Sequence, residues 1–245
     1  MEFDDDAFVL SARAYGEAGA IVEALTRMHG KWAAHVAGGA SRRMRPLLQP
    51  GARVRLRYRA RTSDQLGSAS VESDGEGEGP SALFDDPLAL AGLSSAAAVL
   101  TAALPEREPQ PGAFLAFEAL MEAFGRPEIW PAVLVRFEAG LLEILGFGLD
   151  LGRCAVTGST DDLAWVSPRT GRAVSAQAGE PWKDRLLPLP RFLISAQEPI
   201  QPGDIGAGLA ITGRFLEQFV FGVVSRPLPP ARIRLTEVLA DAGRL

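Results

Sequence analysis

The chain has 245 residues, of which 47% are hydrophobic and 22% are charged. This apolar content is enough for a substantial core and excludes a disordered tail or a fibrous repeat. The single cysteine, Cys154, excludes an internal disulfide framework and favours a reducing compartment. The acidic start, residues 1–6, has neither the basic nor the apolar part of a secretion signal, so we expect a cytoplasmic protein.

The net charge of −5 hides a polarised distribution along the chain. Residues 24–63 contain no Asp or Glu but many basic residues, namely Arg27, Lys31, Arg42, Arg43, Arg45, Arg53, Arg55, Arg57, Arg59 and Arg61. Residues 64–86 show the reverse, with acids and no base. A basic face attracts polyanions whatever the rest of the surface carries, so this asymmetry points to a polyanionic partner.

The first third of the chain is typical of β structure. An apolar run at 7–10 has strand length and is followed by a turn at 15–17. Residues 20–26 and 31–37 are expected to form two strands about a turn, although their alanines leave a helical alternative open. A further strand is expected at 65–72, before the acidic, glycine-rich break at 75–80.

The clearest periodicity lies at 53–61, where arginines alternate with Val54, Leu56, Tyr58 and Ala60. A strict period of two predicts a strand with the guanidinium groups on one face and the apolar set, Tyr58 included, on the other. Five short strands in so few residues favour a small closed barrel such as the OB-fold.

Helical spacing follows at 88–103, 113–124 and 129–147 and returns at 210–224 and 235–242, while 153–190 is irregular. The sequence therefore predicts an α+β protein. Its expected division is an OB-fold DNA-binding domain at 1–80, a helical domain at 81–150, an irregular segment at 151–190, and C-terminal helices at 191–245 that complete the helical domain.

Catalytic motifs are missing from the sequence. It contains no phosphate-binding loop, nucleophile elbow or zinc-protease helix. The two histidines, His29 and His35, lack neighbouring carboxylates in the sequence, and the acidic pairs and triplets are typical of solvated surface. We therefore expect a protein that is not an enzyme and needs no cofactor or metal.

The basic residues have two interpretations. An arginine face can be a solvated strand edge, or it can be a groove for phosphates; the repulsion among like charges on one face favours the groove. Aromatic platforms are few, so contacts to the backbone of DNA should dominate. The candidate DNA surface comprises Lys31, Arg42, Arg43, Arg45, Arg53, Arg55, Arg57, Arg59 and Arg61.

Several short motifs, in order, resemble the RecO family of bacterial recombination mediators. In the first third these are Phe8-Val9-Leu10-Ser11, Tyr15-Gly16-Glu17, Thr26 with His29-Gly30-Lys31, Gly38-Gly39-Ala40-Ser41-Arg42 and Leu48-Gln49-Pro50. Later come Arg136-Phe137-Glu138, Leu141-Leu142 and Leu145-Gly146-Phe147-Gly148-Leu149-Asp150, with Cys154 just after.

This resemblance implies a DNA repair protein that binds single- and double-stranded DNA and anneals complementary strands. With RecR it would help load RecA onto DNA coated by the single-stranded DNA-binding protein SSB. In the family the helical domain binds the acidic, hydrophobic C-terminal tail of SSB, for which Arg136 is the candidate here. The alternative is an interaction scaffold whose basic face docks an acidic partner, with incidental DNA binding.

Many members of the family carry a four-cysteine zinc site in a zinc-finger-like insertion. The corresponding positions here are Cys154, Thr157, Ser175 and Ala178, which cannot supply the thiolates that structural zinc needs. We therefore expect the insertion to lack metal and to keep its shape by packing, with Trp165 and Trp182 as buried anchors.

Overall fold

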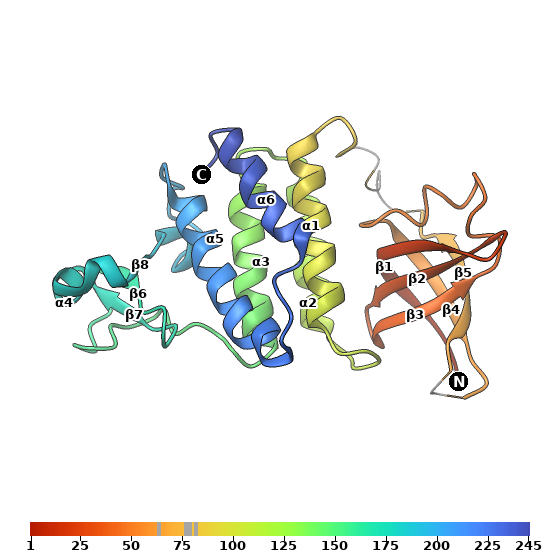
Figure 1. Cartoon of the computed structure of the whole chain (residues 1–245), viewed down its shortest axis with the longest axis horizontal. Helices are drawn as coiled ribbons and strands as arrows, with labels where there is room; N and C mark the ends of the chain where they lie inside the picture. The colour runs from red at the N-terminus through yellow and green to blue at the C-terminus, as the bar shows by residue number, and fades with distance from the viewer. Residues whose placement is uncertain (63–64, 76–79, 81–82) are drawn as a thin grey trace. The chain divides into compact units, whose positions relative to one another are not determined.

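The computed structural model describes every residue except 63–64, 76–79 and 81–82. The contacts within the chain divide it into two compact units, Met1–Glu122 and Ala123–Leu245. Figure 1 shows the β-strands of the first unit in red to orange and the helices and the small sheet of the second in green to blue.

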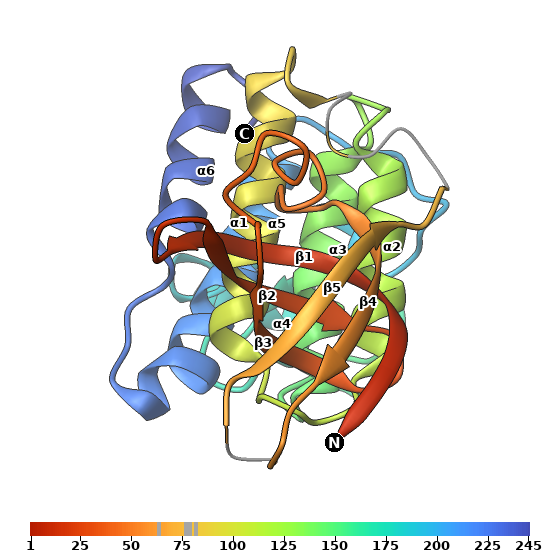
Figure 2. The same cartoon turned by 90° about the vertical axis from the view of Figure 1, so that its right-hand side faces the viewer.

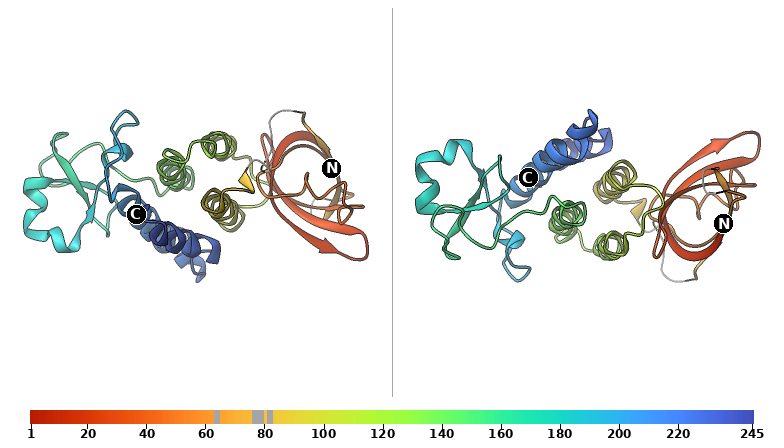
Figure 3. Two further views of the ribbon diagram at one scale, coloured as in Figure 1. Left: turned by 90° about the horizontal axis from the view of Figure 1, so that it is seen from above. Right: turned by 90° about the horizontal axis from the view of Figure 1, so that it is seen from below.

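The first unit begins with a closed barrel of five strands (Figures 2 and 3). The strands are β1 (Glu2–Tyr15), β2 (Gly19–Thr26), β3 (Gly30–Val36), β4 (Arg53–Arg59) and β5 (Gly67–Ser73). Their order around the barrel is β1-β2-β3-β5-β4, with only β3 and β5 parallel. This is the OB-like barrel that the sequence predicts, and the helical alternative for 20–37 is excluded.

β1 is much longer than the apolar run at 7–10 suggests. Its first half pairs with β4 and its second half with β2, and a register shift between Val9 and Ser11 lies near the change of partner. A strand that pairs on both sides closes the barrel and has no free edge there. Its ends are polar, so the apolar pattern marks only the middle of the strand.

The barrel interior is filled by the alternate residues of each strand, as the period of two requires. Val54, Leu56 and Tyr58 of β4 are almost fully buried, which confirms the apolar face predicted for this strand. Tyr58 stacks on Phe3, and its hydroxyl accepts a hydrogen bond from the backbone N–H of Gly67 at 3.1 Å.

Two helices, α1 (Pro87–Ala103) and α2 (Pro111–Ala123), belong to the same unit as the barrel. Asp86 caps α1, because its carboxylate accepts the backbone N–H groups of Leu88 and Ala89 at 3.0 Å. Phe8, on the outer face of β1, packs against Phe114 and Phe117 of α2. The helices therefore cover part of the outside of the barrel.

The second unit is built on α3 (Trp130–Ile144), α5 (Asp204–Phe215) and α6 (Pro230–Asp241). Helix α5 continues into the π-helical turn η4 (Leu216–Phe221) and the short 3-10 turn η5 (Gly222–Val224). α3 and α5 approach closely at Gly208, where a Cβ atom would lie 2.7 Å from a methyl group of Val135. Glu138 of α3 and Arg232 of α6 form an ion pair inside this unit.

Helix boundaries differ from the sequence expectation at identifiable residues. The helix expected to reach residue 147 ends at Ile144, because Gly146 adopts a positive φ of 86°. α6 begins at Pro230 instead of residue 235, since proline is favoured in the first turn of a helix. By length and composition, Asp204–Val224 could also cross a membrane; in this structure Leu209, Ile211 and Phe215 of that run are buried.

The irregular segment forms a small sheet of β6 (Leu163–Val166), β7 (Ala173–Ser175) and β8 (Leu187–Pro188) in the order β7-β6-β8. Short helical turns follow at α4 (Ala176–Gly179), η2 (Glu180–Arg185) and η3 (Arg191–Leu193). Gly179 lies against Trp165, which is half-buried. Trp182 is 57% exposed, so the expectation that it is a buried anchor is wrong.

Candidate nucleic-acid interface

The guanidinium groups of β4 lie on the outer face of the barrel, as the alternation predicts. Arg55, Arg57 and Arg59 are exposed, while Arg53 at the start of the strand is half-buried. Arg61 lies beyond the end of β4 at Arg59, and it is exposed.

The antiparallel register places an acidic residue of β1 opposite each exposed arginine of β4. Glu2 pairs with Arg59, Asp4 with Arg57 and Asp6 with Arg55. We call these six residues the arginine ladder: Glu2, Asp4, Asp6, Arg55, Arg57 and Arg59. Opposite charges across neighbouring strands stabilise the pairing and fix its register.

Ion pairs join the two columns of the ladder. The guanidinium of Arg55 contacts Asp4 at 2.5 Å and Asp6 at 2.7 Å, and Arg57 reaches Asp4 at 3.2 Å. Arg59 contacts Glu2 at 2.9 Å. The repulsion that the sequence suggests for this face is therefore relieved by β1, whose acids have the appearance of a solvated run in the sequence. The carboxylates occupy the positions that phosphates would take.

The ladder also shifts the ionisation of its acids. A hydrogen bond and the charge of Arg59 lower the pKa of Glu2. For Asp4, loss of solvent raises the pKa, but hydrogen bonds from Arg57 and Arg55 outweigh this and leave the pKa below its ordinary value. Both acids therefore remain ionised, and the pairs persist, at neutral pH.

Two of the predicted surface residues are not freely exposed. Lys31 is 6% exposed and its Nζ donates to the backbone carbonyl of Thr101 in α1, so its place on an open DNA surface is wrong. The reason is that α1 covers this part of the barrel. Arg53 forms ion pairs at 2.8 Å with Asp74 and with Glu118 of α2.

The loop between β3 and β4 presents the remaining basic residues. Arg42, Arg43 and Arg45, here called the loop arginines, are all exposed. Within the part of the chain that the structure describes, no carboxylate forms an ion pair with them. Their charge is thus available to a polyanion, in contrast to that of the ladder.

A groove of about 400 Å³ lies between this loop and the second half of β1. It is lined by Ser11, Ala12, Arg13, Ala14, Ala20, Gly39, Ala40, Arg45, Leu48, Gln49 and Pro50. Arg13 and Arg45 are its charged residues. The sequence reasoning missed Arg13, because the strand pattern was followed only to residue 10; the alternation of Ala12, Arg13, Ala14 and Tyr15 was the available signal.

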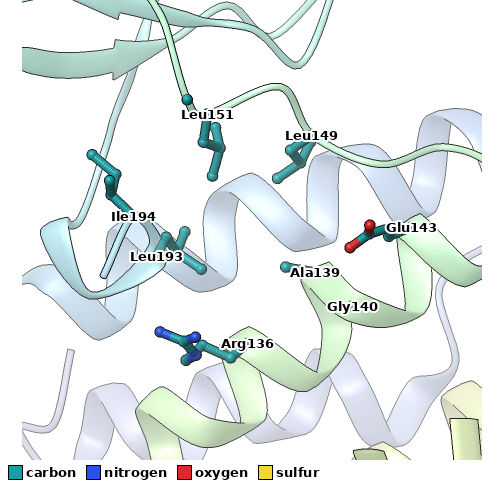
Figure 4. Close-up of a pocket in the computed structure, with 9 residues that line it drawn as sticks. Arg136, Ala139, Gly140, Glu143, Leu149, Leu151, Leu193 and Ile194 are labelled. Atoms are coloured by element: carbon teal, nitrogen blue, oxygen red, sulfur yellow. The ribbon is translucent and has the colours of Figure 1, made fainter. Parts of the chain in front are cut away.

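The second unit contains a pocket of about 420 Å³ beside α3 (Figure 4). Its α3 wall is formed by Arg136, Ala139, Gly140 and Glu143, which share one helix face because they are three or four residues apart. The opposite side is formed by Leu149, Leu151, Gly152, Leu193 and Ile194. We call this site the apolar pocket.

Arg136 lies at one end of the apolar pocket and Glu143 at the other (Figure 4). The Arg136 Nη1 atom donates to the carbonyl of Phe192 at 2.7 Å, which holds the guanidinium beside the leucines. Gly140 has open space in front of it, since a Cβ atom there would meet nothing within 4 Å. An apolar side chain next to a carboxylate is the chemistry that this arrangement can accept.

The insertion does not have the donor set for structural zinc. Cys154 is buried, and its sulfur accepts backbone N–H groups from Val156, Thr157 and Ser175 at 3.3–3.5 Å. Burial raises the pKa of the thiol, but these hydrogen bonds outweigh it and lower the pKa to about 6. Among the described residues no group of three His, Cys, Asp or Glu side chains could hold a metal ion.

Sequence comparisons agree with this architecture. Residues 1–73 match the family described as "Recombination protein O N terminal", and residues 85–224 match "Recombination protein O C terminal". The chain is 72% identical to the DNA repair protein RecO of Phenylobacterium zucineum and 66% identical to that of Caulobacter vibrioides strain NA1000, in both cases over the whole of each chain. It is 51% identical to RecO of Rhodospirillum centenum over 97% of this chain and 94% of that protein. The chain therefore belongs to the RecO family of DNA repair proteins.

Proposed function

We propose that this RecO-family protein is a cytoplasmic, nucleoid-associated mediator without enzymatic activity. It binds single- and double-stranded DNA and anneals complementary strands. Together with RecR it helps load RecA onto SSB-coated DNA. The main support from the geometry is the cluster of loop arginines beside the groove that contains Arg13 and Arg45.

The mechanism of annealing in this proposal is electrostatic. Guanidinium groups on an exposed loop neutralise phosphates of both strands and release their counterions, so the strands can approach without their mutual repulsion. The ladder contributes less, because its arginines already have carboxylate partners. The structure therefore shifts the proposed DNA surface from the β4 face toward the β3–β4 loop.

A strand-annealing assay in a salt series tests this proposal. Complementary oligonucleotides, bare or SSB-coated, are mixed with the protein without nucleotide, and binding is measured in parallel. We expect annealing that fades as salt rises. If the folded wild-type protein neither binds nor anneals DNA, the proposal fails and the scaffold hypothesis replaces it.

The chain offers a matched pair of triple variants for this assay. In one, the loop arginines Arg42, Arg43 and Arg45 are changed to alanine; in the other, Arg55, Arg57 and Arg59 are changed. Each variant loses three positive charges. We expect the loop variant to flatten the slope of log affinity against log salt by up to about 2 on single strands, at about 0.7 per phosphate contact. The ladder variant should change the slope less; an equal or larger effect would return the β4 face to the DNA surface.

We also propose that the apolar pocket binds the C-terminal tail of SSB. The terminal carboxylate would pair with Arg136 and an apolar side chain would fill the space among Leu149, Leu151 and Leu193. A synthetic tail peptide measures this by fluorescence anisotropy. Arg136→Ala removes the anion contact, and Gly140→Leu fills the open space without changing charge. Both variants should lose peptide binding while binding of bare DNA is retained; normal peptide binding by Gly140→Leu would exclude this pocket.

A further inference from the structure

The outer face of β2 and β3 is divided into a covered end and an open end. At the covered end, cross-strand pairs align Phe8, Leu25 and Lys31 in one row. Phe8 packs on α2, and Lys31 is bonded to α1. All three residues are buried. This end of the face is therefore closed to any ligand.

At the open end, a second row is formed by Arg13, Ile21 and His35 on β1, β2 and β3. Arg13 and Tyr15 are two residues apart on β1, so their side chains share one face of the strand. Tyr15 is 54% exposed although it is a large aromatic residue. The open end thus presents an aromatic ring and a guanidinium on one surface.

The contact between Tyr15 and His35 is built into the backbone between them. The two rings meet edge-to-face, with their centroids 5.7 Å apart. Gly19 is the cross-strand partner of Tyr15, and a Cβ atom at this position would lie 2.3 Å from Nε2 of His35. Only the absence of a side chain at residue 19 lets the imidazole lie in this place.

The charge around the ring pair suits a nucleic acid. Arg13 is exposed, and the loop arginines follow β3 directly in the chain. The one acid in the middle of the β2–β3 face, Glu23, accepts a hydrogen bond from the hydroxyl of Ser11 at 2.6 Å. Glu17, in the β1–β2 turn, is the acid nearest in sequence to Tyr15 and is exposed. An aromatic ring with flanking cations stacks on bases while the cations hold phosphates.

We infer that Tyr15, supported by His35 and flanked by Arg13, is a base-stacking site that gives the barrel a preference for single-stranded over duplex DNA. OB-folds bind oligonucleotides on this same strand 2–3 face and its adjoining loops. The bases of a duplex are stacked on one another and offer no free face at this position. The inference rests on the proposed function, since it assigns the strand class to the DNA surface of the barrel.

The test compares a labelled thymidine oligonucleotide with a duplex of the same length, by fluorescence anisotropy over a salt series. Tyr15→Ala should weaken single-strand binding by at least about 5-fold, the loss expected for one stacked base, and change duplex binding less than 2-fold. The salt slope should stay the same because no charge is removed. Tyr15→Phe keeps the ring and should bind as the wild type does.

Two further variants make the result decisive. Trp182→Ala removes an equally exposed aromatic side chain from the second unit and should leave single-strand binding unchanged. His35→Ala removes the support and should reproduce part of the Tyr15→Ala loss. If Tyr15→Ala binds single strands as the wild type does, or weakens duplex binding equally, the stacking site is refuted. If the wild type binds no DNA at all, the proposed function itself has failed.

Discussion

The buried ion pair of the second unit gives the largest effect on stability that a single substitution should cause. Arg232 is 2% exposed and Glu138 is fully buried. The guanidinium contacts the two carboxylate oxygens at 2.5 and 3.0 Å and also donates to the carbonyl of Leu209 at 3.0 Å. Its remaining contact is with the hydroxyl of Thr236 at 2.8 Å. One side chain therefore joins α3, α5 and α6.

Arg232→Met keeps much of the side-chain length and removes the charge. Glu138 is then left buried with one hydrogen-bond donor, the hydroxyl of Thr212. Removing one partner of a buried pair costs about 3–5 kcal/mol, because the other charge stays desolvated without compensation. Glu138→Met with Arg232→Met removes both charges, so the double variant should lose less than the single variant.

Urea denaturation followed by tryptophan fluorescence measures this effect in the second unit, where Trp130 is 2% exposed and reports on the packing of α3. The free energy of unfolding is compared for the wild type and both variants. A loss below about 1 kcal/mol for Arg232→Met would refute the reasoning, because surface ion pairs have that value and the pair would then have access to water. A double variant less stable than the single one would show that the charges contribute net stability.

Three further predictions concern the ladder, the thiol and one glycine. Asp4→Asn with Asp6→Asn frees the guanidinium of Arg55, so DNA affinity should rise and the salt slope should steepen by up to about 0.7 per phosphate gained; an unchanged slope in the binding assay would mean that this face does not meet DNA. The pKa of Cys154 is lowered from 9.0 to about 6, so its thiolate contributes stability that is complete above pH 9, declines as pH falls, and is lost below about pH 6; the difference in unfolding free energy between the wild type and Cys154→Ala, measured from pH 5 to 9.5, should grow with pH, and a flat difference would contradict this. Gly30→Ala should lower the free energy of unfolding by more than about 1 kcal/mol, since Gly30 has a φ of 79° and the added Cβ would collide with the carbonyl of Glu108; a normal melting temperature would contradict it.

The barrel could be predicted because its signals are local. The alternation at β4 depends only on residues two apart, and Val54, Leu56 and Tyr58 are buried as it requires. The resemblance to RecO is likewise confirmed, since the family matches cover most of the chain. The length of β1 was missed because Glu2, Asp4 and Asp6 are polar and look like a solvated terminus when their partners on another strand are unknown.

The surface residues were harder to predict because exposure depends on contacts far apart in sequence. Lys31 belongs to the basic run but meets α1, seventy residues later at Thr101. The ladder arginines find their acids more than forty residues away in β1. By contrast, Arg136 could be proposed for a binding site from a short motif, and the structure places it at the apolar pocket, although the leucines opposite come from separate loops.

The packing of α1 and α2 on the barrel has a consequence for the order of folding. During synthesis the five strands leave the ribosome before the residues that cover Phe8 and Lys31, which lie between Thr101 and Phe117. Until then an apolar row on the outer face of β1 and β2 is exposed to solvent, and such surfaces promote aggregation. The nascent chain therefore passes through a barrel that is closed but not yet covered, and a fragment ending at residue 80 would be held permanently in that state.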